Sequence, residues 1–124
     1  GDRVVSKPIL CLDFDGVIHS YSSGWKGAEI IPDPPVPGAI DFIRDALGYF
    51  DVQIYSSRSG QSGCINAMQA WLFTHSDDYK LVDAVGWPDA KPAAFITIDD
   101  RALTFDGTWP RIADLKNFKP WNKK

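Results

Sequence analysis

The feature that most constrains the fold is a short, continuous apolar run, residues 9–12, which ends directly in Asp13 and Asp15. A continuous apolar run of this length is typical of a strand buried on both faces, as in a parallel sheet. Residues 52–55 and 95–98 also predict buried strands, and both end in polar side chains. We therefore expect parallel strands whose polar carboxyl ends meet at one edge of a sheet.

The segments between these runs predict helices. Apolar side chains recur at helical spacing over residues 36–50, where Pro37 opens the helix, and again over residues 65–75. Pro110 can start a last short helix, and residues 81–85 and 103–105 predict two more short strands. Strands that alternate with helices predict an α/β fold with a mostly parallel sheet.

The chain is expected to form a single domain over residues 1–124. A length of 124 residues suits one domain, and no repeat or long linker marks a boundary. Residues 17–35 are rich in Gly, Ser, Pro and Tyr and contain two short β-like segments, 17–18 and 29–31. We interpret this stretch as a hairpin-like excursion from the fold.

Composition limits which classes of partner the chain can bind and indicates the compartment in which it works. With 13 basic and 16 acidic residues, the chain lacks the broad positive surface of a duplex-binding protein. No apolar run approaches the ~20 residues that span a bilayer, so no membrane partner is expected. Cys11 and Cys64 lie in apolar settings without a CxxC motif, which predicts buried free thiols and a reducing, cytoplasmic location.

The ends of the predicted strands carry the chemistry. Ligands of open α/β sheets bind outside the carboxyl ends of the strands. The polar groups there are Asp13, Asp15, Ser56, Arg58, Asp99 and Asp100. Two like charges ~4 Å apart cost about 4 kcal/mol at an effective dielectric of 20, so four carboxylates in one crevice call for a cation. Oxygen ligands suit Mg²⁺, and Lys91, just before the last apolar run, could add a positive charge.

Each of these features taken alone has a structural interpretation. A DxD sequence after a strand is commonly a turn or a cap, and Asp99-Asp100 could cap a following turn. Ser56-Ser57 resembles a helix N-cap, and a lone Lys91 is typical of a solvated surface. Their occurrence in order, each at an expected strand end, favours a functional site.

The same residues resemble the motifs of the haloacid dehalogenase (HAD) superfamily of phosphohydrolases. Residues 10–17, an apolar strand followed by DxDG, resemble the first motif, and residues 54–56 resemble the second. Lys91 resembles the lone basic residue of the third, and residues 96–100, ending in paired acids, resemble the fourth. The resemblance implies a Rossmann-like HAD core, with a mostly parallel sheet and helices on both faces.

The resemblance also implies a mechanism. Asp13 would be the nucleophile that forms an aspartyl-phosphate, and Asp15 would protonate the leaving group and then activate water. Ser56 would hydrogen-bond the phosphoryl oxygens, and Lys91 would neutralise charge on the nucleophile and the phosphate. These roles imply a phosphoric monoester hydrolase.

The resemblance implies Mg²⁺ as the cofactor. The ion would be held by Asp13, by the backbone carbonyl of Asp15 and by an acid of the fourth motif. Asp100 is favoured as the direct ligand, because the second acid of such a pair usually binds the metal. Asp99 would then hold a metal-bound water or Lys91.

Two details resemble the nucleotidases and polynucleotide phosphatases of the superfamily. They are Ser56-Ser57-Arg58 and the sequence Asp99-Asp100-Arg101. The resemblance implies substrate contacts from Ser57 and Arg58, and a substrate that is a phosphorylated small molecule or a nucleic-acid end. The alternative for Arg58 is a salt bridge across the crevice.

The chain is short for this superfamily. The two positions where a cap domain is usually inserted hold only residues 17–35 and 86–92, which predicts a capless enzyme with a short flap, residues 17–31. An open site suits a macromolecular substrate or a second copy of the chain that covers it. In the flap, Trp25 could stack on a base or pack on the core, and His19 could contact substrate or pack beneath the flap.

The sequence as a whole predicts a Mg²⁺-dependent phosphomonoester hydrolase. Two alternatives remain open. One is a catalytically silent module that binds phosphate or nucleic acid. The other is a phosphomutase, which normally needs a cap.

Overall fold

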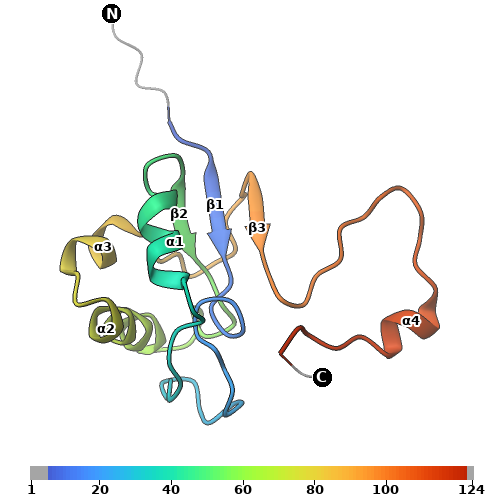
Figure 1. Ribbon diagram of the computed structural model, residues 1–124, viewed down its shortest axis with the longest axis horizontal. Coiled ribbons are helices and arrows are strands. Elements are labelled where there is room, and N and C mark those ends of the chain that lie inside the picture. Colours follow the sequence, from blue (N-terminus) through green and yellow to red (C-terminus); the bar gives the residue numbers. More distant parts are fainter. Residues whose placement is uncertain (1–5, 123–124) are drawn as a thin grey trace, which may run out of the picture.

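The computed structural model of this chain describes residues 6–122, and its centre is a three-stranded parallel sheet. Strand β1 (Ile9–Leu12) lies between β2 (Asp51–Ile54) and β3 (Ile96–Ile98), as Figure 1 shows. All three strands run in the same direction, and their carboxyl ends therefore meet at one edge. The parallel sheet predicted from the apolar runs is confirmed. The burial predicted for residues 95–98 is wrong, because β3 is an edge strand and all three of its residues are exposed.

Helices connect these strands. Helix α1 (Ala39–Ala46) joins β1 to β2, while α2 (Cys64–Ser76) and α3 (Tyr79–Ala84) join β2 to β3. Helix α4 (Ile112–Lys116) follows the sheet, close to the start predicted at Pro110. The α/β class is thus the one the sequence predicts.

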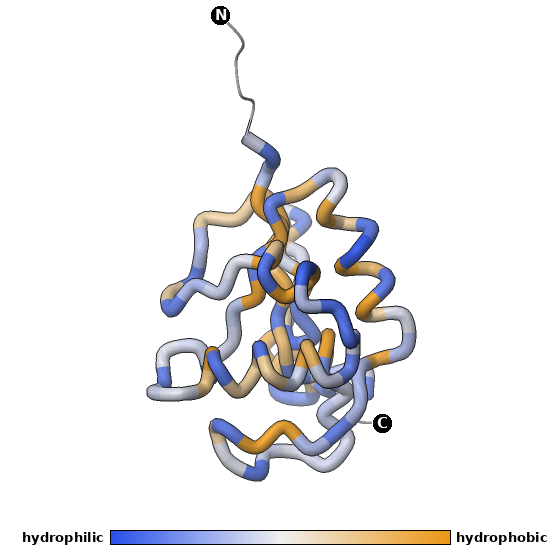
Figure 2. The backbone as a smooth tube through the Cα atoms, turned by 90° about the vertical axis from the view of Figure 1, so that its left-hand side faces the viewer, coloured by the Kyte–Doolittle hydropathy of each residue, from blue (hydrophilic) through white to orange (hydrophobic). Residues whose placement is uncertain are grey.

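The hydrophobic core lies between one face of the sheet and the first three helices. Leu10 and Leu12 pair in register with Val52 and Ile54, so the four side chains share that face. The helical side chains that complete the core are Ile43, Ala46, Met68, Trp71, Leu72, Leu81 and Val82. Burying a Leu, Ile or Met side chain contributes about 1.5–3 kcal/mol each. The alternation of polar and apolar positions along α1 can be followed in Figure 2.

The strand predicted at residues 81–85 is wrong, because this segment is mostly helical. Asp78 is the N-cap of α3, and its carboxylate accepts the backbone N–H of Leu81 at 3.1 Å. Leu81, Val82 and Val85 are buried, a spacing that one helical turn satisfies as well as a short strand does. Strand-like pairing is limited here to an isolated bridge between Gln53 and Gly86.

The strand predicted at residues 103–105 does not form. Residues 101–119, called the arm below, extend away from the body of the molecule (residues 6–100), as Figure 1 shows. Leu103 and Phe105 remain more than half exposed, so no packing holds them against the edge of β3. Helix α4 lies within the arm and apart from the sheet. In the described residues the second face therefore lacks the helical layer that the HAD resemblance implies.

The flap, residues 17–31, is not a β-hairpin. Its ordering comes from turns and from isolated bridges of His19 to Asp15 and to Pro35. No cap domain is present between residues 6 and 122.

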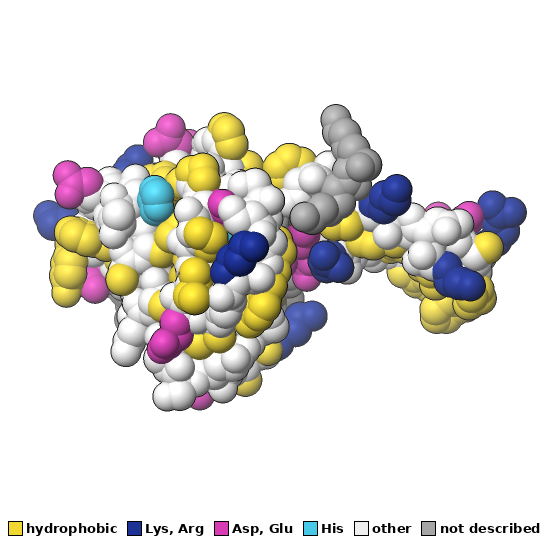
Figure 3. Space-filling model, turned by 90° about the horizontal axis from the view of Figure 1, so that it is seen from below, with side chains coloured by type: hydrophobic (Ala, Val, Ile, Leu, Met, Phe, Trp, Pro, Cys, Tyr) yellow, Lys and Arg dark blue, Asp and Glu magenta, His cyan; other side chains and the backbone are white. Residues whose placement is uncertain are grey.

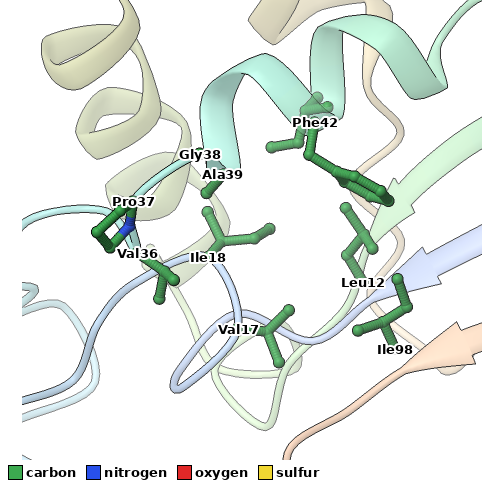
Figure 4. Close-up of a pocket in the computed structure, with 10 residues that line it drawn as sticks. Leu12, Val17, Ile18, Val36, Pro37, Gly38, Ala39, Phe42 and Ile98 are labelled. Carbon is green, nitrogen blue, oxygen red and sulfur yellow. The ribbon is translucent and has the colours of Figure 1, made fainter.

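An apolar pocket lies between α1, β1 and β3. Figure 4 shows its lining, in which Leu12 and Ile98 of the sheet face Phe42 and Ala39 of α1. The pocket has a volume of about 360 Å³ and is present because α1 covers β1 but leaves β3 partly open. Ile98 accordingly remains 38% exposed.

Two further expectations concern the cysteines and the membrane. Cys11 and Cys64 are both buried free thiols, as predicted. Among residues 6–122, no helix is long and apolar enough to cross a membrane.

Candidate functional site

The candidate site lies at the carboxyl ends of the strands. Asp13 directly follows β1, Asp99 and Asp100 directly follow β3, and Ser56 comes two residues after β2. The backbone N–H of Asp13 donates to the carbonyl of Ile98 at 3.0 Å, which joins the first two of these strand ends. Figure 3 looks onto this edge from below, where acidic and basic side chains meet near the start of the arm.

Three carboxylates form a compact acidic triad. Asp13, Asp99 and Asp100 each present an oxygen, and these oxygens all lie within 4.8 Å of one another. Asp99 is exposed, whereas Asp13 and Asp100 are partly buried. The pairing of β1 with β3 brings these acids together from positions more than eighty residues apart in the chain. The structure therefore unites three of the acids that the sequence singled out.

Gly16 makes room for the triad. Its φ of +84° lies in the left-handed region that favours glycine. A Cβ atom at this position would overlap the carboxylate of Asp100. The glycine of the Asp-Phe-Asp-Gly sequence is thus required both by the turn and by the approach of Asp100.

The triad changes the acidity of Asp13. Burial raises the pKa of Asp13 to about 7, and the negative charges of Asp99 and Asp100 add to this effect. The backbone N–H of Phe14, which donates to Asp13 Oδ1 at 2.9 Å, opposes it but does not offset it. In residues 6–122, no Lys or Arg forms an ion pair with any of the three acids.

The donor set fits a hard divalent cation. Carboxylate oxygens are the ligands that Mg²⁺ and Ca²⁺ prefer, and Mg²⁺ in particular binds through few carboxylates and retains water. The spacing of the triad allows its oxygens to face one ion, and such an ion would relieve their mutual repulsion.

Asp15 has the opposite environment. Its Oδ1 accepts from His19 Nδ1 at 2.9 Å and from Arg58 Nη2 at 3.2 Å, and its Oδ2 accepts from Arg58 Nε at 2.9 Å. Burial alone would raise the pKa of Asp15, but the hydrogen bonds from His19 and Arg58 and the charge of Arg58 outweigh it. The pKa of Asp15 therefore lies below its ordinary value.

Arg58 is completely buried, at 0% exposure. Besides Asp15, it donates to the carbonyls of Gly27, Ala28 and Ile30 in the flap, at 2.8, 2.7 and 3.3 Å. The salt bridge that the sequence left as an alternative is therefore formed. A substrate contact by Arg58 stays a prediction for which this arrangement offers no support.

His19 lies beneath the flap and is completely buried. Its Nε2 accepts the backbone N–H of Asp33 at 3.1 Å, so the ring proton resides on Nδ1 and is donated to Asp15. Of the two positions that the sequence left open for His19, packing beneath the flap is the one observed. Sequence reasoning missed its bond to Asp15, although the i,i+4 spacing of two polar groups was a signal.

The serines after β2 order their own loop. Ser56 is 3% exposed, and its hydroxyl accepts the backbone N–H of Arg58 at 3.0 Å. Ser57 is exposed, and its carbonyl accepts from Gln61 Nε2 at 3.1 Å. Both serines line the cavity at the acidic site, where phosphate contacts remain a prediction.

Lys91 is exposed, and no hydrogen bond or ion pair within residues 6–122 joins it to the triad. Its charge nevertheless affects the pKa of the Cys11 thiol. Burial raises the pKa of the Cys11 thiol, the Lys91 ammonium lowers it, and the carboxylates of Asp13 and Asp99 raise it further. A contact between Lys91 and the nucleophile therefore stays a prediction.

A cavity of about 190 Å³ unites most of these groups. Its lining residues are Asp13, Asp15, Tyr21, Trp25, Ser56, Ser57, Asp100 and Arg101. The flap thus supplies two aromatic walls, and the residue after the paired acids supplies a cation. The larger pocket of Figure 4 contains none of the acidic groups, so the chemistry rather than the size of the hollow identifies the site.

Fold and site together define a small α/β domain with a three-stranded parallel sheet and a partly exposed acidic triad. Comparisons with protein-family models, with curated proteins and with solved structures find no match for this chain.

Proposed function

We propose that this chain is a Mg²⁺-dependent phosphomonoester hydrolase of the HAD type that acts through an aspartyl-phosphate on Asp13. The observation that carries the proposal is the meeting of Asp13, Asp99 and Asp100 at the carboxyl ends of parallel strands, with oxygens within 4.8 Å. The order of the motifs along the chain agrees with it.

The cation would be held by the carboxylates of Asp13 and Asp100 and by the backbone carbonyl of Asp15, while Asp99 would hold a metal-bound water or Lys91. When bound, Mg²⁺ supplies charge neutralisation and orients the phosphate. The partly buried Asp13, with its pKa of about 7, supports the need for such a charge, because the chain itself places no cation in contact with the triad within residues 6–122.

The chain's own residues divide the chemistry. Asp15, which is ionised in its pair with Arg58, first takes up a proton from solvent as the substrate binds. A carboxylate oxygen of Asp13 then attacks phosphorus, the bond to the ester oxygen breaks, and that proton goes from Asp15 to the departing oxygen. Asp15 then takes a proton from water as that water attacks the phosphorus of the aspartyl-phosphate. Inorganic phosphate leaves, and Asp13 returns to its starting form.

Neighbouring groups would orient the phosphate. The serines of the loop after β2 line the cavity of about 190 Å³, beside Asp13 and Asp15. A cavity of this size suits the phosphate rather than a whole large substrate, so the remainder of the substrate would extend past Tyr21 and Trp25. We propose a phosphorylated small molecule or a nucleic-acid end as this substrate, with Lys91 neutralising charge on the phosphate.

One observation favours a second candidate, a phosphate-binding module without turnover. Asp15, the proposed proton donor, is held by Arg58 and His19 in an ion-paired arrangement that a binding protein could keep for structural reasons. The two candidates differ in whether Asp13 becomes phosphorylated.

Trapping the covalent intermediate tests this difference. The protein is mixed with an aryl phosphate labelled at phosphorus and with Mg²⁺, and the reaction is quenched in acid. We expect label on the protein that resists acid but is released by hydroxylamine, as an acyl phosphate is. The label should be lost in Asp13→Asn and kept in Asp45→Asn, a matched control at an exposed position on α1. Mg²⁺ binding without any label or phosphate release would favour the binding module.

A further inference from the structure

Arg58 connects three separate segments of the molecule at the edge of the site. It belongs to the loop after β2, it pairs with Asp15 in the loop after β1, and it donates to carbonyls of residues 27–30 in the flap. The ring of Trp25 lies over the guanidinium, with the ring centroid 4.6 Å from Cζ. One buried side chain therefore holds together the loops that carry the site and the flap that covers it.

This arrangement uses what distinguishes arginine from lysine. A guanidinium is planar and presents donors in a fixed fork, which lets it bind a carboxylate at two points while its remaining donors reach other acceptors. Nε and Nη2 of Arg58 face Asp15, while Nη1 faces the flap. A lysine ammonium could keep the charge but could not satisfy both directions at once.

The flap is the wall of the site that Arg58 controls. Tyr21 and Trp25 line the same cavity as Asp13 and Asp15. No regular strand holds the flap in residues 17–31, so its position depends on individual hydrogen bonds. Three of these are the bonds from Arg58 to the carbonyls of Gly27, Ala28 and Ile30.

Arg58 also fixes the orientation of Asp15. Both carboxylate oxygens are engaged, Oδ2 by Arg58 and Oδ1 by Arg58 and His19. A carboxylate held at both oxygens cannot rotate freely, so its direction relative to Asp13 is set by these partners.

We infer that Arg58 is a positioning residue that holds the flap over the acidic site and orients Asp15, and that it acts through these groups rather than on the substrate. The part of this inference that concerns the position of the flap, called the flap half below, does not depend on any catalytic activity of the chain. The part that concerns the orientation of Asp15 is called the Asp15 half. The Asp15 half rests on the proposed function.

Limited proteolysis tests the flap half without any assay of activity. Lys26 is exposed in the flap, next to Trp25, and trypsin can cleave after it once the segment opens. In Arg58→Lys, we expect cleavage after Lys26 to be at least about tenfold faster, since local opening governs such cleavage. Cleavage after Lys116 in the arm, measured by mass spectrometry in the same digest, should not change.

Two further variants make this result specific. Arg44→Lys alters an exposed ion-paired arginine on α1 and should leave cleavage after Lys26 at the wild-type rate. Trp25→Leu removes the stacked ring from the flap side and should also speed cleavage while Arg58 is intact, which covers the case that Arg58→Lys does not fold. Wild-type cleavage after Lys26 in both folded Arg58→Lys and Trp25→Leu would overturn the flap half.

A double-mutant cycle tests the Asp15 half. Aryl phosphate turnover is measured in wild type, Arg58→Lys, Asp15→Asn and the double variant. Misplacement of a catalytic group by about 1 Å can cost about 100-fold, so we expect a loss of that order in Arg58→Lys alone. In the Asp15→Asn background the same change should cost less than about threefold, because coupled residues are not additive.

The outcomes separate this inference from the proposed function. An equal loss in both backgrounds would show that Arg58 acts on the substrate or on the fold at large, which overturns the positioning role. A wild-type protein without metal-dependent turnover would overturn the proposed function and the Asp15 half with it, while the proteolysis would still decide the flap half.

Discussion

The two sides of the candidate site treat the same chemical group in opposite ways. On one side, Asp13 lies with Asp99 and Asp100, and burial and like charges raise the pKa of Asp13 to about 7. On the other side, two residues further along the chain, Asp15 is paired with Arg58 and hydrogen-bonded by His19, and the pKa of Asp15 is lowered. Distance along the chain does not explain the difference, but the partners do.

This contrast shows which carboxylates of the site are neutralised by a Lys or Arg of the same chain. The Asp15 side carries its own buried cation, which also fastens the flap. The triad side has no Lys or Arg in an ion pair within residues 6–122, and it is the more open to solvent at Asp99. A site with one balanced and one unbalanced carboxylate is suited to take up a cation from solution, and such opposed environments are common where acids have different roles.

The largest effect on stability is expected from removing the ion pair between Asp15 and Arg58. Asp15→Asn would leave the guanidinium of Arg58 buried without its counter-charge, which typically costs about 3–5 kcal/mol. We expect the free energy of unfolding, measured by urea denaturation in EDTA, to fall by this amount. Asp45→Asn, at an exposed position, should change it little, and an equally stable Asp15→Asn protein would contradict the importance of the pair.

Substitution of Lys91 tests whether a cation that does not contact the acidic triad still neutralises its charge. If Lys91 neutralises the nucleophile and the phosphate as proposed, Lys91→Ala should lower turnover of an aryl phosphate by about a thousandfold, or about 4 kcal/mol in the activation free energy. Lys80→Ala, at an exposed position on α3, is the matched control. Turnover that survives Lys91→Ala would agree with the absence of a direct contact and would remove Lys91 from the site.

Because Asp13 is partly buried beside two other carboxylates, its replacement by a neutral side chain is predicted to stabilise the chain. The unfolded Asp13 titrates near 3.8 and the folded one near 7, so the folded chain retains a proton that the unfolded chain loses between these values. Stability from this group is therefore highest at low pH and falls as the pH rises through that window. In EDTA at pH 8, Asp13→Asn should raise the free energy of unfolding by about 1–3 kcal/mol.

The pH dependence serves as the control for this prediction. The advantage of Asp13→Asn should shrink as the pH falls toward 4 and should also shrink when Mg²⁺ is added to the wild-type protein at pH 8. Thermal unfolding followed by circular dichroism measures both. An advantage that is the same at pH 4 and pH 8 would show that the charge of Asp13 is not its cause.

The smallest effect is expected for the difference in Mg²⁺ affinity between substitutions of Asp99 and of Asp100. If Asp100 is the direct ligand, Asp100→Asn should weaken Mg²⁺ binding by at least about tenfold more than Asp99→Asn, since outer partners commonly contribute 10–100-fold and ligands more. Isothermal titration calorimetry with Mg²⁺ measures this difference. Stronger weakening in Asp99→Asn would reverse the assignment.

Much of the site could be predicted from the sequence because strand ends are easy to find. A continuous apolar run predicted β1, and mostly apolar segments predicted β2 and β3. Their parallel order placed Asp13 beside Asp99 and Asp100. The strand prediction for residues 81–85 was wrong because an apolar run of this length is compatible with one helical turn as well as with a strand. The N-cap bond that Asp78 accepts from Leu81 stabilises the helix. The segment at 103–105 failed because no packing partner holds it against the edge strand.

The other side of the site was harder to foresee. That Arg58 would turn inward, toward Asp15 and three flap carbonyls, depends on tertiary distances that spacing along the chain does not encode. The same holds for His19, whose proton position follows from a backbone N–H fourteen residues away, at Asp33. Sequence patterns located the groups, while the choice of their partners required the fold.

The most direct measurement is phosphate release from a panel of nucleotides, 3′- and 5′-phosphorylated oligonucleotides and sugar phosphates, with Mg²⁺ or with EDTA. A phosphatase that depends on Asp13 should release phosphate from at least one compound with Mg²⁺, lose this activity in EDTA, and lose it in a folded Asp13→Asn protein. Release that persists in Asp13→Asn, or no release from any compound while Mg²⁺ still binds, would contradict the assignment of Asp13 as the nucleophile of a hydrolase.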